Sequence, residues 1–131
     1  MKFIGFIKKF DPKNPFSVEL KDYGSSNDLK SDELIKIIEY LKSGVSIWDW
    51  MEYWFDENDE PIGGAEYYSD GEWVWPLYYI YYLVKYKISV DHDFLAHCRK
   101  NDFKMAQIDN KQKMDLSKEF ETIIFTRTPS R

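Results

Sequence analysis

Aromatic side chains crowd the middle of this 131-residue chain. All five Trp and seven of the ten Tyr lie between Lys42 and Lys85. Rings of this size must be buried in a core or covered by a partner, because exposed apolar surface is unfavourable in water. One face of a small sheet cannot hide all of them. The sequence therefore predicts that part of this aromatic set is exposed and takes part in binding.

The same segment is strongly acidic. It runs for 42 residues without Lys or Arg, and its nine carboxylates are Asp49, Glu52, Asp56, Glu57, Asp59, Glu60, Glu66, Asp70 and Glu72. The remainder of the chain carries all 18 basic residues and the other 14 acidic ones, and the net charge is -5. Such a centre repels nucleic acid and attracts a basic protein. We therefore expect a basic protein partner and no nucleic-acid partner.

Length and cysteine content indicate one domain in a reducing compartment. We expect a globular domain over residues 1–127 and a loose tail over 128–131. Cys98 is the single cysteine, which excludes an intramolecular disulfide. Two lysines interrupt the apolar N-terminus too early for a signal peptide, and the longest uncharged run is 12 residues, whereas a bilayer span needs about 20. The expected location is cytoplasmic, with no membrane partner; the oligomeric state stays open.

Three helices are predicted from caps and from 3.6-residue periodicity. The first spans 32–43, with Ser31 as its N-cap and Gly44 as a left-handed stop. The second spans 77–86 after Pro76, and the third spans 92–101 with Asp91 as its cap. In the second helix we expect Leu77, Ile80, Tyr81 and Val84 to face inward, so that Tyr78, Tyr79 and Tyr82 are exposed.

Strands are predicted over 3–9, 46–55 and 72–75 from their β-branched and aromatic content. Neither face of 46–55 is polar, so we expect it to be covered on both sides. Ser69-Asp70-Gly71 predicts a hairpin between residues 67–68 and 72–75. Residues 122–126 favour a strand, with a helix capped by Ser117 as the alternative. The predicted fold is α+β, with a mostly antiparallel sheet and about three packed helices.

The periodicities also predict a core. Its expected members are Phe3, Phe6, Leu34, Ile37, Ile38, Leu41, Ile47, Met51, Val74, Ile80, Val84, Phe94, Leu95 and Cys98.

Motifs for catalysis or metal binding are absent from the sequence. His92 and His97 are five residues apart, which places them poorly on one helix face, and Pro61 breaks a calcium-loop reading of the 56–60 loop. No nucleophile elbow or phosphate loop occurs. We therefore predict no catalytic residues, metal or cofactor. One enzymatic alternative stays open, in which Glu52 and Glu72 act as an acid–base pair on a sugar held by tryptophans.

The candidate site is accordingly a partner-binding surface. Its predicted members are the nine carboxylates together with the three tyrosines expected to be exposed: Asp49, Glu52, Asp56, Glu57, Asp59, Glu60, Glu66, Asp70, Glu72, Tyr78, Tyr79 and Tyr82.

One block of the sequence resembles a known group of proteins. Residues 68–76 read Tyr-Ser-Asp-Gly-Glu-Trp-Val-Trp-Pro, residues 81–86 continue the pattern with two tyrosines and Lys-Tyr, and 93–95 read Asp-Phe-Leu. With the opening residues 1–7, this resembles small bacterial immunity proteins of polymorphic and contact-dependent toxin systems. The resemblance implies a protein that binds a cognate toxin domain, in many cases a basic nuclease, and blocks it. A general adaptor module and a small carbohydrate-acting enzyme are the alternatives.

Overall fold

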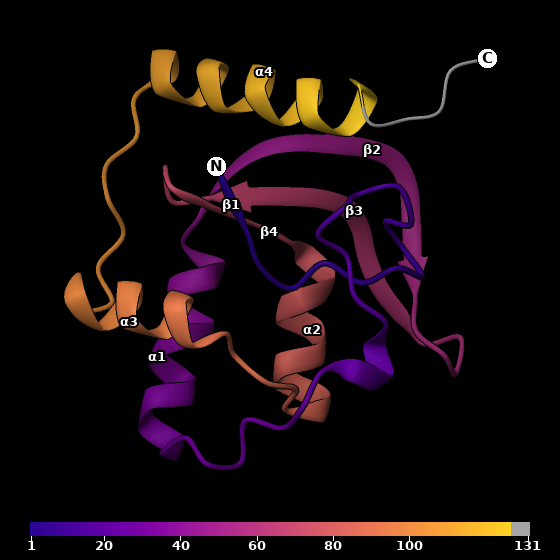
Figure 1. Cartoon of the computed structure of the whole chain (residues 1–131), viewed down its shortest axis with the longest axis vertical. Helices are drawn as coiled ribbons and strands as arrows, with labels where there is room; N and C mark the ends of the chain where they lie inside the picture. Colours follow the sequence, from indigo (N-terminus) through magenta and orange to yellow (C-terminus); the bar gives the residue numbers. More distant parts are fainter. Residues whose placement is uncertain (127–131) are drawn as a thin grey trace.

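The computed structural model of the chain describes residues 1–126 and has an α+β fold. Its strands are β1 (Lys2–Phe3), β2 (Val45–Phe55), β3 (Pro61–Ser69) and β4 (Trp73–Pro76), in the sheet order β1-β4-β3-β2. Its helices are the short 3-10 helix η1 (Leu20–Asp22), then α1 (Ser31–Lys42), α2 (Leu77–Tyr86), α3 (His92–Lys100) and α4 (Asn110–Thr126) (Figure 1). Within the described residues, no helix combines the length and apolar character that a bilayer crossing requires.

The three predicted helices are confirmed, and so is the cap of the third. Asp91 accepts hydrogen bonds from the backbone N–H groups of Asp93 and Phe94 at the start of α3. At α1 the predicted N-cap is wrong, since Ser31 is the first helical residue and Lys30 stands at the cap position without a side-chain cap hydrogen bond. Gly44 is required for a different reason from the one expected. A Cβ there would lie 2.5 Å from Trp75 Cζ2, so close packing, not a left-handed turn, excludes a side chain.

The predicted hairpin is also confirmed, with β3 and β4 antiparallel and Ser69 opposite Val74. The expected strand over 3–9 is wrong beyond Phe3. Gly5 has a φ of +80°, which ends the extended conformation, and a Cβ at this position would overlap the Tyr79 ring. The chain then turns, and within the expected segment Ile7 pairs with Val18 in an isolated bridge.

Both faces of the inner strand β4 are covered, since all four of its residues are buried. Trp75 contacts the rings of Tyr40 in α1 and Phe94 in α3. On the opposite face, Tyr67 of β3 packs between Phe6 and Phe120. The helices α1, α2 and α3 therefore lie on one side of the chain's sheet and α4 on the other (Figure 1).

The C-terminal strand over 122–126 is a wrong prediction, since these residues belong to α4. The alternative helix is right in kind, but it begins at Asn110 rather than near Ser117. Helix growth is cooperative. The helix that the Lys, Gln, Leu and Glu residues before 122 favour therefore extends through the β-branched residues of 122–126. Phe120 is fully buried against the sheet and anchors the helix. The tail predicted over 128–131 lies outside the described residues.

The inward face of α2 is rotated from the predicted one. Tyr78, Tyr79 and Tyr82 are fully buried, so their expected exposure is wrong, whereas Val84 is 51% exposed. Periodicity of aliphatic residues misplaces the face because a tyrosine can be buried once its hydroxyl has an acceptor. Of the other predicted core residues, Phe3 and Ile38 are partly buried and Met51 is exposed. The remaining ten are buried as predicted: Phe6, Leu34, Ile37, Leu41, Ile47, Val74, Ile80, Phe94, Leu95 and Cys98.

The outer half of β2 is not covered on both sides as expected. Asp49 pairs with Glu66 and Tyr53 with Gly64, so four steps along β2 match two steps along β3. This bulge carries residues 50–52 out of the regular ladder, and Met51 is fully exposed at its centre. β2 is also one of the two edge strands of the sheet, so it offers an unpaired backbone edge to a partner.

We predict that burial, not residue type, determines how much each isoleucine of α1 contributes to the free energy of unfolding. Ile37 is fully buried and Ile35 is 59% exposed. Ile37→Ala should lower the free energy of unfolding by about 2–5 kcal/mol. Ile35→Ala, the matched control on the same helix, should change it by less than about 0.5 kcal/mol. Urea denaturation followed by circular dichroism measures both, and equal losses would show that the helix faces the core differently.

Candidate protein-docking site

Buried tyrosine hydroxyls use several of the chain's carboxylates as hydrogen-bond acceptors. Tyr67 and Tyr78 each donate to a carboxylate oxygen of Asp11 at 2.6 Å. Tyr40 donates to Asp70, and Tyr82 donates to both oxygens of Glu57 at 2.9 and 3.0 Å. Burial, followed by the Asp70 carboxylate, raises the pKa of Tyr40 far above its ordinary value. These tyrosines therefore stay protonated and remain donors throughout the physiological range.

Asp70 is the acceptor at the centre of one such network. Its Oδ1 accepts the backbone N–H groups of Glu72 and Trp73, which holds the β3–β4 turn. Its Oδ2 accepts from Tyr40 and lies 2.8 Å from His97 Nε2. One buried carboxylate thus joins the turn to α1 and α3. The predicted role of Asp70 as a partner contact does not fit its burial, with a side chain 1% exposed.

Asp56 likewise joins a turn to a helix, at the other end of β3. Its Oδ2 accepts from Tyr81 at 2.6 Å, and its Oδ1 accepts the backbone N–H groups of Asn58 and Glu60. The Tyr81 hydrogen bond lowers the pKa of Asp56 well below its usual range, and the backbone bonds add to this against the effect of burial. The 56–60 segment is therefore not a free acidic loop. Asp56 is buried and fastens the β2–β3 turn to α2.

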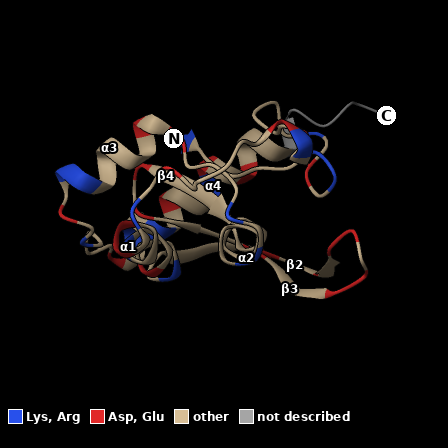
Figure 2. Ribbon diagram, turned by 90° about the horizontal axis from the view of Figure 1, so that it is seen from below, with Lys and Arg blue, Asp and Glu red and all other residues tan. Residues whose placement is uncertain are grey.

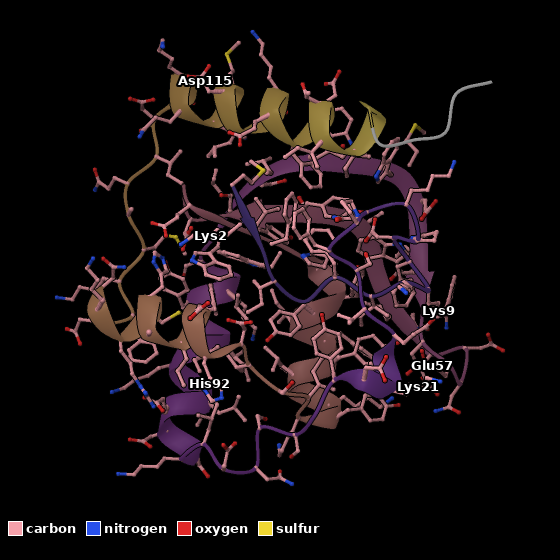
Figure 3. All side chains as sticks on the ribbon, viewed as in Figure 1. Lys2, Lys9, Lys21, Glu57, His92 and Asp115 are labelled. Atoms are coloured by element: carbon pink, nitrogen blue, oxygen red, sulfur yellow. The ribbon has the colours of Figure 1, made fainter. Side chains whose placement is uncertain are left out.

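Three more of the predicted contact residues already have partners. Glu57 lies 3.6 Å from the Lys9 amine (Figure 3), and Glu72 lies 3.2 Å from the Lys2 amine. Glu66 accepts hydrogen bonds from Ser46 and Tyr68. Glu72 lies in the β3–β4 turn, whereas Glu57 lies in the β2–β3 turn, so the whole length of β3 separates them. The nine carboxylates therefore do not form one surface.

Four further carboxylates are exposed: Asp49, Glu52, Asp59 and Glu60. None of them takes part in an ion pair among residues 1–126. They flank the exposed apolar side chains of β2, which are Trp50 (37% exposed), Met51 (106%), Tyr53 (57%) and Phe55 (46%). We call these eight residues the hairpin surface. Figure 2 shows the β2–β3 hairpin extending beyond the helices, with Asp and Glu at its turn.

The composition of the hairpin surface fits protein recognition. Tyr, Trp, Phe and Met are enriched at the centres of protein interfaces, and an edge strand offers its backbone as well. Sequence reasoning identified the carboxylates but assigned the exposed rings to α2 instead of β2. The signal that could have revealed the exposed rings was the absence of a polar face in the eleven-residue strand β2. We interpreted that absence as burial of the strand on both sides.

The geometry does not support the enzymatic alternative of a Glu52–Glu72 pair. Glu52 lines a pocket with Asp11 and Trp50, whereas Glu72 lines a separate groove with His97. An acid–base pair on one substrate needs both carboxyls in the same cleft. Among the described residues, no group of three His, Cys, Asp or Glu side chains could hold a metal ion. Cys98 is buried, and burial raises the pKa of its thiol to about 12, so it is not a reactive thiolate.

Comparison with known proteins assigns no family. No protein-family model matches the chain, and neither a curated protein nor a solved structure is significantly similar to it.

We predict that Asp70 is essential for stability and that its neighbour Glu72 is not. Asp70→Ala leaves the Tyr40 hydroxyl and two backbone N–H groups without their acceptor, so it should cost at least about 2–3 kcal/mol. Glu72→Ala removes a side chain 53% exposed, and it should cost under about 1 kcal/mol. Chemical denaturation of both variants is the measurement. Similar losses for both would contradict the central role of Asp70.

We also predict an unusually acidic titration for Asp56 that depends on Tyr81. Its folded-state pKa is lowered, so the stability it contributes is fully present above the ordinary Asp pKa of about 3.9 and is lost as the pH falls below it. Tyr81→Phe removes the principal donor and should move the pKa back toward the ordinary value. Carboxyl carbon NMR shifts followed between pH 2 and 7 measure this, with Tyr86→Phe as the control for the longer 3.4 Å contact. An unchanged Asp56 titration in Tyr81→Phe would refute the assignment.

Proposed function

We propose that this protein is an immunity protein that binds and neutralises a cognate bacterial toxin domain through the hairpin surface. The observation that carries the proposal is the group of exposed rings and Met51 on an edge strand, surrounded by carboxylates without ion-pair partners among residues 1–126. The resemblance of residues 68–86 to immunity proteins supports the same function. The proposed place of action is the cytoplasm, where an incoming toxin must be neutralised.

The two kinds of side chain at this surface have different tasks. Exposed carboxylates attract a basic toxin over a distance and speed encounter, as they would for a nuclease whose own surface is adapted to nucleic acid. Rings such as Tyr53 and Phe55, whose centroids are 5.4 Å apart, provide the area that is buried on contact. An inhibitor of this kind needs no catalysis, because covering the active site or the substrate entry is enough.

The hairpin is held in place before binding. Asp56 and Glu57 fix its turn to α2 through Tyr81 and Tyr82, and Trp54 anchors β2 in the core at 3% exposure. A preformed surface loses less conformational entropy when it binds, so a larger part of the contact free energy contributes to affinity. The tyrosine–carboxylate pairs therefore support binding indirectly, through the position of the hairpin.

Neutralisation in cells tests the proposal directly. The C-terminal domain of the toxin encoded beside this protein is expressed in a host with and without it. Growth should be restored by the wild-type protein and not by a Met51→Glu/Tyr53→Glu variant, which changes two exposed side chains, makes the surface more acidic by two charges and disrupts the apolar contact. Ile35→Glu, at an exposed site on α1, is the matched control and should restore growth. If the purified domains do not bind each other, the immunity function is wrong.

We predict that the turn carboxylates act on the association rate. Asp59→Asn/Glu60→Lys changes the charge by three units and respects the left-handed backbone of Asp59, whose φ is 60°. It should slow association with the toxin domain by about three- to tenfold at low salt. The difference should shrink as salt rises, since the screening length falls from about 10 Å at 0.1 M to about 3 Å at 1 M.

Surface plasmon resonance at several salt concentrations measures these rates. Asp28→Asn/Glu39→Lys makes the same charge change at exposed positions before and within α1, and its association rate should stay close to that of the wild type. Equal slowing by both variants would mean that only net charge matters. No slowing by either would remove the turn from the steering surface.

A further inference from the structure

A pocket opens beside the exposed rings of β2 and shares two residues with the hairpin surface. It has a volume of about 330 Å³ and is lined by Trp50 and Glu52 from β2 and by Asp11 and Asn14 from the loop that follows residue 10, with Phe10 and Tyr67 in its walls. Its size falls in the range of pockets that enclose a small ligand or a single large side chain. A partner docked on β2 would therefore cover its mouth.

The charged groups that line this pocket favour the binding of a cation. Asp11 and Glu52 come close enough for the Glu52 charge to raise the pKa of Asp11, after the larger effect of burial. Neither carboxylate has an ion-pair partner among residues 1–126, although Lys13 also lines the pocket. Each Asp11 oxygen accepts one tyrosine hydrogen bond and keeps a second lone pair. Two carboxylates against one lysine leave a net negative pocket.

Asn14 adds a second and independent requirement. Asn14 is 7% exposed, and its side-chain Oδ1 accepts a hydrogen bond from the backbone N–H of Phe16 at 2.9 Å. That bond fixes the orientation of the amide, and Nδ2 has no hydrogen-bond partner among the described residues. A buried donor without an acceptor is unfavourable by the cost of its lost hydration. A ligand that brings a carbonyl oxygen as well as a cation would satisfy both features.

We infer that this pocket receives an arginine side chain of the protein partner, with the guanidinium between Asp11 and Glu52 and a main-chain carbonyl of the partner near Asn14. The planar guanidinium suits two carboxylates and an indole better than an ammonium does, because it donates in a fork and stacks on aromatic faces. Apolar groups such as Phe10 and Pro12 can contact its methylene stem. The inference rests on the proposed docking of a basic protein at the hairpin surface.

The pH dependence of arginine binding follows from the same groups. The charged and titratable side chains that line the pocket are Asp11, Lys13, Glu52 and Tyr67, and Tyr78 bonds Asp11 from α2. Burial and Glu52 raise the pKa of Asp11 above the ordinary Asp value. A cation requires the ionised carboxylate, so binding should weaken on acidification at a higher pH than an ordinary aspartate would impose.

A partner-independent experiment tests the pocket first. Nα-acetyl-arginine N-methylamide, which carries the guanidinium and two carbonyls, is titrated into the ¹⁵N-labelled protein while the Trp50 indole N–H resonance is followed by NMR. Its citrulline analogue has the same shape without the charge. We expect the Trp50 signal to move with the arginine probe, to move several-fold less with citrulline, and to lose its arginine response in Glu52→Gln. Equal responses to both probes, or an unchanged response in Glu52→Gln, would overturn the inference.

The variants are chosen so that folding and recognition are separable. Asp11→Asn removes an acceptor of two buried tyrosines and can unfold the protein, whereas Glu52 is exposed, so Glu52→Gln retains the fold. Asp28→Asn, at an exposed position outside both the pocket and the hairpin surface, is the matched neutralisation and should leave the probe response unchanged.

Kinetics with the toxin domain then separate the pocket from the docking surface. Glu52→Gln should raise the dissociation rate constant by at least about tenfold, as expected for loss of a desolvated charge partner, whereas the turn variant acts on association. If the wild-type protein does not bind the toxin domain, the proposed function fails. If it binds but Glu52→Gln dissociates at the wild-type rate, the docking surface stands and the arginine pocket is wrong.

Discussion

A buried tyrosine hydroxyl must donate a hydrogen bond to an acceptor, and the rest of the structure depends on this requirement. The core contains five buried tyrosines beside its aliphatic residues, and Tyr67, Tyr78 and Tyr82 are fully buried. An unpaired hydroxyl inside a protein is costly, while a bond to an ionised carboxylate is among the stronger hydrogen bonds. Asp11, Asp56, Glu57 and Asp70 are those acceptors, and each one ties a loop or turn to a helix or to the sheet.

This arrangement gives the unusual charge pattern an internal explanation. The central acidic segment resembles a surface prepared for a basic partner, yet its carboxylates divide into two groups. One group is occupied by tyrosines, lysines and backbone N–H groups of the same chain. The other group is exposed around the outer half of β2, without ion pairs in the part of the chain that the structure describes, and it lies beside Met51 and three exposed rings. Partner binding is proposed for the second group because none of its carboxylates forms an ion pair among residues 1–126, although Glu52 accepts a hydrogen bond from the Trp54 indole.

The two groups are coupled through the hairpin. Tyrosine–carboxylate bonds at its turn hold the hairpin in one position, and Trp50 belongs both to the exposed rings of β2 and to the pocket of Asp11 and Glu52. Asp11, which lies outside the acidic segment, connects the core to the pocket, since it accepts from two core tyrosines and also lines the pocket. A carboxylate held in this way is oriented before any ligand arrives, which favours recognition of a cation.

The sequence alone determined the elements whose signals are local. Helical periodicity and the Asp91 cap identified α1 and α3, and Ser69-Asp70-Gly71 identified the hairpin, because caps and turns depend on neighbouring residues. Tertiary structure decided the inward face of α2, the exposure of Met51 and the helical state of 122–126. Each depends on distant partners: acceptors such as Asp11 and Glu57 allow tyrosines to be buried, the unequal pairing of β2 with β3 creates the bulge, and Phe120 needs the sheet to pack against. Contacts between residues far apart in the chain leave no local signal, so the exposed rings of β2, for which partner binding is proposed, became visible only in the folded molecule.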